Sequence, residues 1–126
     1  MSHNTYKQTA VTTASRGQIL LMLYEAAIRN TKKAMESIEK NDMTAKGNAI
    51  GKVHDIVNEL ANTLDHKVAG NIATDLERLY NFMVEQLLKA NLENSKDALQ
   101  QVLKLLETLY SGWKVAVEEF NKTGGK

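Results

Sequence analysis

Apolar residues recur at steps of three and four along most of the chain, which is the spacing of amphipathic helices. The clearest series lies near the end of the chain and comprises Leu99, Val102, Leu106, Leu109, Trp113, Ala116 and Phe120. Two earlier series comprise Ile50, Val53, Val57, Leu60 and Leu64, and then Ile72, Leu76, Leu79, Met83, Leu87 and Ala90. The pattern predicts helices over residues 15–39, 43–64, 71–90 and 96–120, with an N-terminal arm over 1–14 and a flexible tail over 121–126.

Local start signals support the first and last of these helices. Ser15 and Gln18 have the spacing of a capping box, and Ser95 is a suitable N-cap. Long helices joined by short loops pack antiparallel to their neighbours in sequence. We therefore expect an all-α fold, an antiparallel up-down-up-down four-helix bundle that forms a single domain over residues 1–126, preceded by a short N-terminal arm or helical segment.

Composition narrows the classes of function. The 126 residues include no cysteine and no proline, and 16 basic against 15 acidic side chains give a net charge of +1. The lack of cysteine excludes disulfides, thiolate catalysis and cysteine-ligated metals, and the near-zero charge gives no global drive toward nucleic acid. The chain shows neither a signal-peptide pattern nor an apolar run of ~18 residues. We expect a cytoplasmic protein without direct membrane insertion.

Histidine positions argue against a bundle metal site. Such sites use Glu-x-x-His pairs, but Gly51 precedes His54 by three residues and Thr63 precedes His66 by three. A three-histidine site would need His3 from the arm. No catalytic serine or threonine has a partnered base, and no phosphate-binding glycine motif occurs. The sequence therefore predicts no catalytic residues, no metal and no cofactor.

A phosphotransfer-type four-helix bundle stays open as an alternative function. His54 would be its phosphorylated residue, although Asp55 and the residues after it lack the lysine expected near a phosphoryl group. Two further features concern the helix surfaces. Glu25/Arg29 and Glu36/Lys40 have the i,i+4 spacing of ion pairs. Two glycines, at 47 and 51, either allow close backbone approach or weaken the first turns of their helix.

The informative feature is a second series of apolar residues beside the first. A wider core stripe explains part of it, but the almost entirely apolar run Ile19–Tyr24 exceeds what one bundle face absorbs. The surplus predicts a groove for an amphipathic helix of a client protein. The expected groove residues are Leu21, Tyr24, Ile28, Ile56, Tyr80, Leu103, Tyr110 and Val117. Two apolar side chains of the arm, Tyr6 and Val11, are expected to cover part of this groove in the free protein.

Ordered motifs over residues 4–116 resemble one known family. The motifs are Asn4-x-Tyr6, Val11-x-Thr13-Ala14-Ser15, Leu20-Leu21-Met22-Leu23-Tyr24-Glu25-Ala26-Ala27-Ile28, Ile50-x-Lys52, Ile56, Leu60, Leu64-Asp65, Ile72-Ala73-x-x-Leu76-x-x-Leu79-Tyr80-x-Phe82-Met83, Leu87-Leu88-x-Ala90-Asn91 and Trp113. Together they resemble the flagellar secretion chaperone family (FliS). The chain departs from the family pattern at Arg16, where relatives usually have proline, and at Glu85-Gln86, where basic residues are common.

The resemblance implies a cytosolic helical-bundle chaperone, not an enzyme. Its implied client is the disordered C-terminal region of flagellin, which it would keep from polymerising before export. The resemblance also implies delivery to a membrane protein of the export gate in the flagellar type III secretion apparatus, and it leaves other flagellar proteins open as partners. A structural helical protein that buries its surplus apolar side chains in a homodimer is the second alternative.

Overall fold

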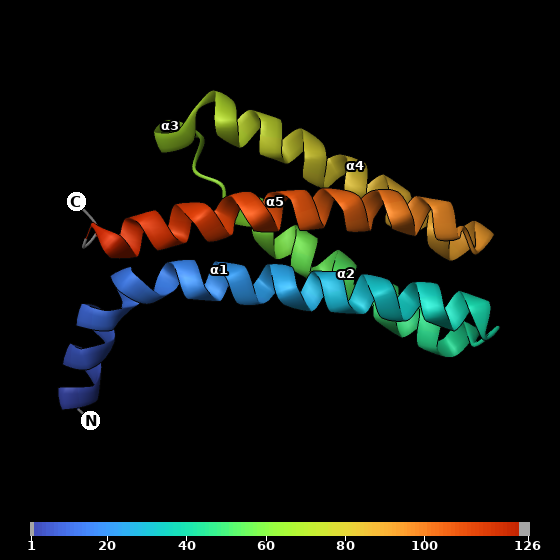
Figure 1. Ribbon diagram of the computed structural model, residues 1–126, viewed down its shortest axis with the longest axis horizontal. Helices are drawn as coiled ribbons and strands as arrows, with labels where there is room; N and C mark the ends of the chain where they lie inside the picture. Colours follow the sequence, from blue (N-terminus) through green and yellow to red (C-terminus); the bar gives the residue numbers. More distant parts are fainter. Residues whose placement is uncertain (1, 124–126) are drawn as a thin grey trace.

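The computed structural model describes the backbone of residues 2–123 and the side chains of residues 16–123. All regular secondary structure in that part of the chain is helical, which confirms the predicted all-α class. The helices are α1 (Ser2–Glu39), α2 (Met43–Asn62), α3 (His66–Ala69), α4 (Asn71–Glu93) and α5 (Lys96–Lys122). Figure 1 shows the four long helices running in alternating directions as a bundle.

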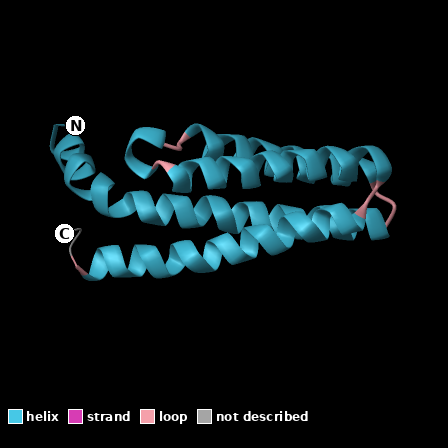
Figure 2. Ribbon diagram, turned by 90° about the horizontal axis from the view of Figure 1, so that it is seen from above, coloured by secondary structure: helices cyan, strands magenta, loops and turns pink. Residues whose placement is uncertain are grey.

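Each long helix has two neighbours in the bundle. α1 packs against α2 and α5, and α4 packs against the same two helices from the opposite side. Within the described residues, the diagonal pairs α1 with α4 and α2 with α5 do not pack backbone to backbone. Figure 2 shows the long helices lying side by side, with the connections at the two ends. The four helices therefore enclose one shared core and leave four grooves on the outside.

The start of α1 differs from the prediction. The backbone is helical from Ser2, so the expected helix start at Ser15 is wrong. No proline interrupts the segment, and its residues all tolerate helical dihedrals. Figure 1 shows this first part turned away from the bundle axis. A Cβ atom added to Gly17 would lie 2.8 Å from both γ-carbons of Val117, so glycine lets α1 approach α5 closely where the two helices meet.

The other helix ends follow ordinary capping chemistry. Asp42 accepts a hydrogen bond from the backbone N–H of Ala45 at 3.1 Å, and Ser95 accepts one from Ala98 at 3.1 Å. The connection after α2 contains the short helix α3, which the sequence analysis did not predict. α3 contacts only α4, and it ends at Gly70, whose φ of 53° lies in the region that favours glycine.

One lysine ties the start of α2 to the end of α4. Lys46 is buried, and its ammonium donates to the carbonyl oxygen of Asn91 at 2.9 Å and to Oδ1 of Asn94 at 2.6 Å. Asn94 has a φ of 53° and ends α4 in the left-handed conformation. A cation at a helix C-terminus satisfies carbonyl oxygens that have no partner within the helix. The charge of Lys46 is thus accommodated by hydrogen bonds rather than by a carboxylate.

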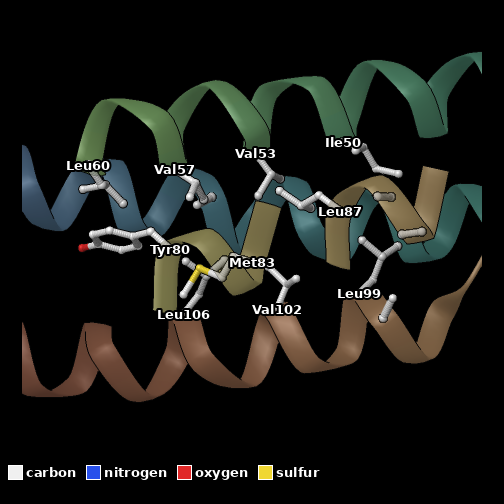
Figure 3. Close-up of a cluster of buried hydrophobic side chains, with 14 of the residues drawn as sticks. Ile50, Val53, Val57, Leu60, Tyr80, Met83, Leu87, Leu99, Val102 and Leu106 are labelled. Atoms are coloured by element: carbon white, nitrogen blue, oxygen red, sulfur yellow. The ribbon is translucent and has the colours of Figure 1, made fainter. Parts of the chain in front are cut away.

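The core lies along the bundle axis and includes residues of all four long helices. Figure 3 shows Ile50, Val53, Val57, Leu60, Tyr80, Met83, Leu87, Leu99, Val102 and Leu106 directed toward one another from α2, α4 and α5. On α4 the buried face differs from the predicted one. Ala73 and Tyr80 are buried, whereas Ile72 is 64% exposed and Leu79 is half-buried. The prediction is confirmed for Leu76, Met83, Leu87 and Ala90, which are buried, so the difference is confined to positions 72 and 79.

A hydrogen-bonded trio explains why tyrosines occupy the core. The hydroxyls of Tyr24 on α1 and Tyr80 on α4 lie 2.5 Å apart across the bundle diagonal. The indole N–H of Trp113 on α5 donates to the Tyr24 hydroxyl at 3.1 Å. Tyr24 is 0% and Tyr80 2% exposed, and burial raises the pKa of both hydroxyls. Because the polar tips are partnered, the rings can pack as core side chains.

Candidate functional site

Five of the eight predicted groove residues are core residues instead. Leu21, Tyr24, Tyr80, Leu103 and Val117 are all buried within the single chain. The prediction was wrong for these five because a four-helix bundle absorbs a wider apolar stripe than the sequence analysis assumed. The tyrosines also satisfy their hydroxyls internally. The remaining three, Ile28, Ile56 and Tyr110, are half-buried and pack against the core from outside.

Two of these three lie together in the groove between α1 and α5. Ile28 comes from α1 and Tyr110 from α5, and both line a pocket of about 640 Å³. The other lining residues are Glu25, Arg29, Lys32, Lys33, Glu36, Glu107 and Ser111. We call this surface the α1/α5 groove. It combines apolar and aromatic side chains with charged residues along the rim, as a surface that binds an amphipathic helix does.

Two polar contacts connect α1 and α5 across this groove. The Tyr110 hydroxyl donates to Oε2 of Glu25 at 2.6 Å, and this hydrogen bond raises the pKa of Tyr110. The ammonium of Lys32 lies 4.0 Å from Oε2 of Glu107. Both contacts are exposed to solvent, so each can exchange for water at little cost. The groove is therefore bridged at its surface by contacts that a docking segment can displace.

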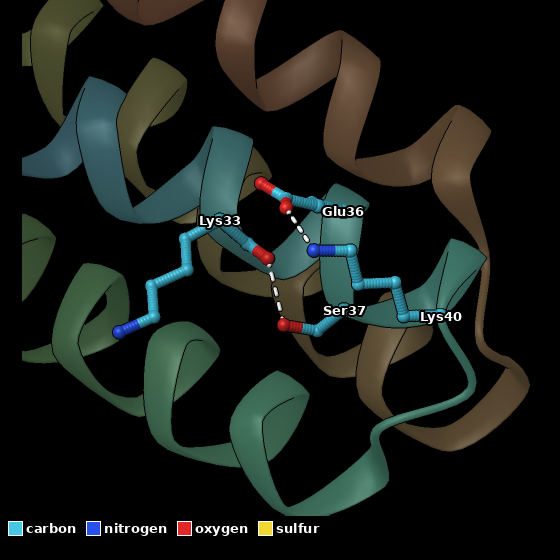
Figure 4. A network of polar contacts seen from close by, with 4 residues as sticks. All are labelled: Lys33, Glu36, Ser37 and Lys40. Atoms are coloured by element: carbon cyan, nitrogen blue, oxygen red, sulfur yellow. Dashed lines mark hydrogen bonds and ion pairs between the residues drawn. The ribbon is translucent and has the colours of Figure 1, made fainter.

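The charged residues of α1 only partly follow the i,i+4 prediction. The Lys40 ammonium donates to Oε1 of Glu36 at 2.6 Å, which confirms that pair; the bond lowers the pKa of Glu36 and raises that of Lys40. Figure 4 shows this contact beside the hydrogen bond from the Ser37 hydroxyl to the carbonyl oxygen of Lys33. The predicted Glu25–Arg29 pair is absent within 4.0 Å, and Glu25 accepts a hydrogen bond from Tyr110.

Two smaller pockets lie in other grooves. One of about 430 Å³ lies between α1 and α2 and is lined by Arg16, Ile19, Leu20, Leu23, Leu60 and Thr63. One of about 250 Å³ lies between α2 and α4 and includes His54, Leu88 and the two glycines of α2. A Cβ atom on Gly47 or Gly51 would meet nothing within 4 Å. The interpretation that these glycines allow close approach within the chain is therefore wrong.

Several exposed apolar residues were not among the predicted groove residues. Ile19 is 54% and Met22 64% exposed, although the neighbouring Leu21 was assigned to the surface. The other large apolar residues that are exposed among the described side chains are Met43, Val68, Ile72, Phe82, Leu88, Leu92, Val115 and Phe120. Ile72 and Phe120 had been placed on core-facing seams. The sequence already showed an excess of apolar residues in the run Ile19–Tyr24. The pattern alone does not say which of these side chains face the core.

The described side chains form no cluster of three or more His, Cys, Asp or Glu residues that could hold a metal ion. His54 Nδ1 lies 3.2 Å from the side-chain nitrogen of Asn58, and His66 Nε2 lies 3.7 Å from Oε2 of Glu77. No described helix has the length and apolar character that a membrane crossing needs. Tyr6 and Val11, the expected covering residues, lie outside the described side chains.

Comparisons with known proteins agree on one family. Residues 1–119 match the family model described as flagellar protein FliS. A flagellar secretion chaperone FliS of Salmonella typhimurium is 38% identical over 108 residues, which cover 85% of this chain and 80% of the relative. The proteins of that name from Bacillus subtilis and Vibrio cholerae are 28% identical over 120 residues and 30% identical over 124 residues. These matches cover 95% of this chain in both cases, and 89% and 91% of the respective relatives.

Proposed function

Because this chain belongs to the FliS family of flagellar secretion chaperones, we propose that it binds the C-terminal region of flagellin and keeps it from polymerising before export. The observation that carries the proposal beyond the family assignment is the α1/α5 groove. Its half-buried Ile28 and Tyr110 offer an apolar surface between two long helices, with polar contacts that are easily displaced. An amphipathic segment that presents apolar side chains at i, i+3/i+4 and i+7 fits such a groove.

The physical demands of the task agree with this surface. A segment that is disordered before assembly pays an ordering cost of several kcal/mol when it folds on binding. Affinity must then come from many apolar contacts spread over a wide surface. Exposed side chains such as Ile19, Met22 and Leu88 extend the apolar area beyond the groove itself. A large negative heat-capacity change on binding is therefore expected.

The proposal includes the setting in which the chaperone acts. The protein works in the bacterial cytosol and passes flagellin to a membrane protein of the type III export gate. We further propose that the N-terminal segment, which is turned away from the bundle axis in Figure 1, folds back so that Tyr6 and Val11 cover part of the client surface in the free chain, and that it moves aside when flagellin binds. Such a cover lowers the apparent affinity, because only the open fraction of the chaperone binds the client.

Titration calorimetry of the full chain with the C-terminal region of flagellin tests the function. We expect saturable one-to-one binding with a negative heat-capacity change. Tyr110→Asp should lower the affinity about tenfold or more, since a charge would enter the apolar floor. Leu92→Asp is the matched control, because Leu92 is 74% exposed on α4 and does not line this groove. Circular dichroism checks that both variants keep the fold.

Two outcomes would overturn the proposal. The first is the absence of flagellin binding together with a stable homodimer in sedimentation, which would support the self-associating alternative. The second is the appearance of an acid-labile phosphoryl group on His54 after incubation with a phospho-donor, again without flagellin binding. If Leu92→Asp lost binding and Tyr110→Asp did not, flagellin would remain the client, but the binding surface would lie on α4 and not in the α1/α5 groove.

A further inference from the structure

We infer that the α1/α5 groove selects a helical segment whose apolar face is flanked by carboxylates, and that Arg29 is the residue that recognises them. The inference rests on the proposed function, since it names the chemistry of the client segment that occupies this groove. It depends on which charged residues of the groove already have partners inside the chain and which do not.

The acidic residues of the groove are all engaged. Glu25 accepts the Tyr110 hydroxyl at 2.6 Å, and Glu36 accepts the Lys40 ammonium at 2.6 Å. Glu107 lies 4.0 Å from the ammonium of Lys32. Three carboxylates in the lining would by themselves favour a basic client. Because each one has a partner within the chain, the field that they present to a docking segment is reduced.

Two basic residues of the same groove have no such partner. No carboxylate of the described residues lies within 4.0 Å of the Arg29 guanidinium or the Lys33 ammonium. The two side chains are four residues apart on α1, so they project from the same face of the helix one turn apart. Figure 4 shows the Lys33 side chain extended away from Glu36. The rim of the groove therefore carries two cations next to Ile28 that have no carboxylate within 4.0 Å, although Lys33 attracts Glu36 over a longer distance.

Tyr110 contacts the carboxylate that stands closest to Arg29 in helix spacing. Glu25 stands four residues before Arg29, which is the spacing that favours an ion pair along a helix. The hydroxyl of Tyr110 reaches Glu25 from α5 instead, and the Glu25–Arg29 pair does not form. Glu25 thus has a partner on α5, whereas no described carboxylate lies within 4.0 Å of the Arg29 guanidinium, which is available to a docked segment.

The affinity of a docked helix should depend on the charge of the residues that flank its apolar face. Its apolar face would remove water from the rim beside Ile28, and a desolvated guanidinium without a partner is costly. A carboxylate on the docked helix offers Arg29 two parallel hydrogen bonds, which neither an amide nor a lysine can supply. Lys33 adds attraction for a second carboxylate one turn along. An acidic flank is therefore favoured, a neutral flank is weaker and a basic flank is repelled.

The test uses designed peptides and the full chain. Each peptide has about 20 residues, so that it can be helical, and all share one apolar face. Two flanking positions four residues apart carry Glu, Gln or Lys. We expect the Glu peptide to bind about three- to tenfold more tightly than the Gln peptide, with an advantage that shrinks as salt is added. Arg29→Gln should remove most of that advantage and leave only the smaller share that Lys33 supplies. Arg78→Gln, the same change at an exposed position of α4, should retain it.

A charge reversal separates recognition from a general effect of net charge. Arg29→Glu should prefer the Lys peptide over the Glu peptide, whereas Arg78→Glu should keep the original preference. Equal affinity of the Glu and Gln peptides for the unmodified chain would overturn the inference, as would equal effects of the changes at 29 and 78. Binding of flagellin without binding of any peptide would overturn the inference and leave the proposed function standing. Absence of flagellin binding with the peptide preference intact would overturn only the proposed function.

Discussion

The buried tyrosine pair offers the sharpest test of how this bundle is held together. The Tyr24 oxygen is shared between two partners, the hydroxyl of Tyr80 at 2.5 Å and the indole N–H of Trp113 at 3.1 Å. Tyr24→Phe removes that oxygen and leaves both partners without it. Tyr80→Phe leaves the contact between Trp113 and Tyr24 in place. The two substitutions delete the same atom type from the same layer of the core but should differ in cost.

The magnitudes follow from burial. Tyr80 is 2% exposed, so its hydroxyl finds no water after Tyr24→Phe, whereas the half-buried Trp113 can reach solvent. Stranding a buried hydroxyl costs about 1–3 kcal/mol, so we expect Tyr24→Phe to lower the free energy of unfolding by about 2–4 kcal/mol in all. Tyr80→Phe should cost about 1 kcal/mol, as the loss of one net hydrogen bond. The double variant should be no less stable than Tyr24→Phe alone, because it strands no tyrosine hydroxyl.

Urea unfolding followed by circular dichroism measures all three variants. The double-mutant cycle should give a coupling energy of about 1–2 kcal/mol between the two positions. Tyr110→Phe is the control, because it deletes an exposed hydroxyl and should leave the unfolding midpoint unchanged. Strictly additive costs, or a larger loss for Tyr80→Phe than for Tyr24→Phe, would refute the reasoning that the Tyr24 oxygen is the shared partner.

Three further outcomes are expected. Burial raises the pKa of Tyr24 and Tyr80 above the ordinary value of 10.0, so above pH 10 the unfolded chain loses these two protons before the folded chain does. The free energy of unfolding should therefore be retained below pH 10 and fall above it, by up to about 2.7 kcal/mol per pH unit for two protons. A variant with both tyrosines changed to Phe whose alkaline stability curve is equally steep would contradict this. Gly17→Ala should lower the free energy of unfolding by about 1–3 kcal/mol through overlap with Val117, whereas Gly47→Ala should raise it by about 0.5–1 kcal/mol. Equal effects in urea titrations would argue against the close contact. Deleting residues 2–12 should tighten flagellin binding in calorimetry and increase self-association in sedimentation, and no change in either would remove the covering role of the arm.

The helical content was within reach of the sequence because it depends on local features. Ser95 caps its helix as predicted, and the i,i+4 pair of Glu36 and Lys40 forms. The apolar steps of α2 from Ile50 to Leu60 mark the face that is buried. Each of these features consists of contacts or steps between residues no more than four positions apart. Their energies do not depend on which helix lies opposite, so spacing and side-chain type are sufficient to predict them.

The candidate site was only partly within reach. The apolar pattern of the sequence placed Ile28 and Tyr110 among the groove residues, and the structure brings them together in one groove. It could not show that the hydroxyl of Tyr110 engages Glu25 in place of Arg29. That choice depends on a distance between two helices separated by most of the chain. A local i,i+4 rule fails where a residue from another helix competes for the same carboxylate.

The sequence by itself determined that this chain forms long amphipathic helices, that it carries more apolar surface than one narrow seam needs, and that cysteine and proline chemistry plays no part. Tertiary structure alone decided which of the apolar side chains are hidden. Tyr24 and Tyr80 lie in the core, where their hydroxyls meet across the bundle diagonal, and Ile72 is exposed. The physical reason is that helix periodicity defines the width of an apolar stripe, whereas its rotation depends on whether the polar tips of its large side chains find partners on other helices.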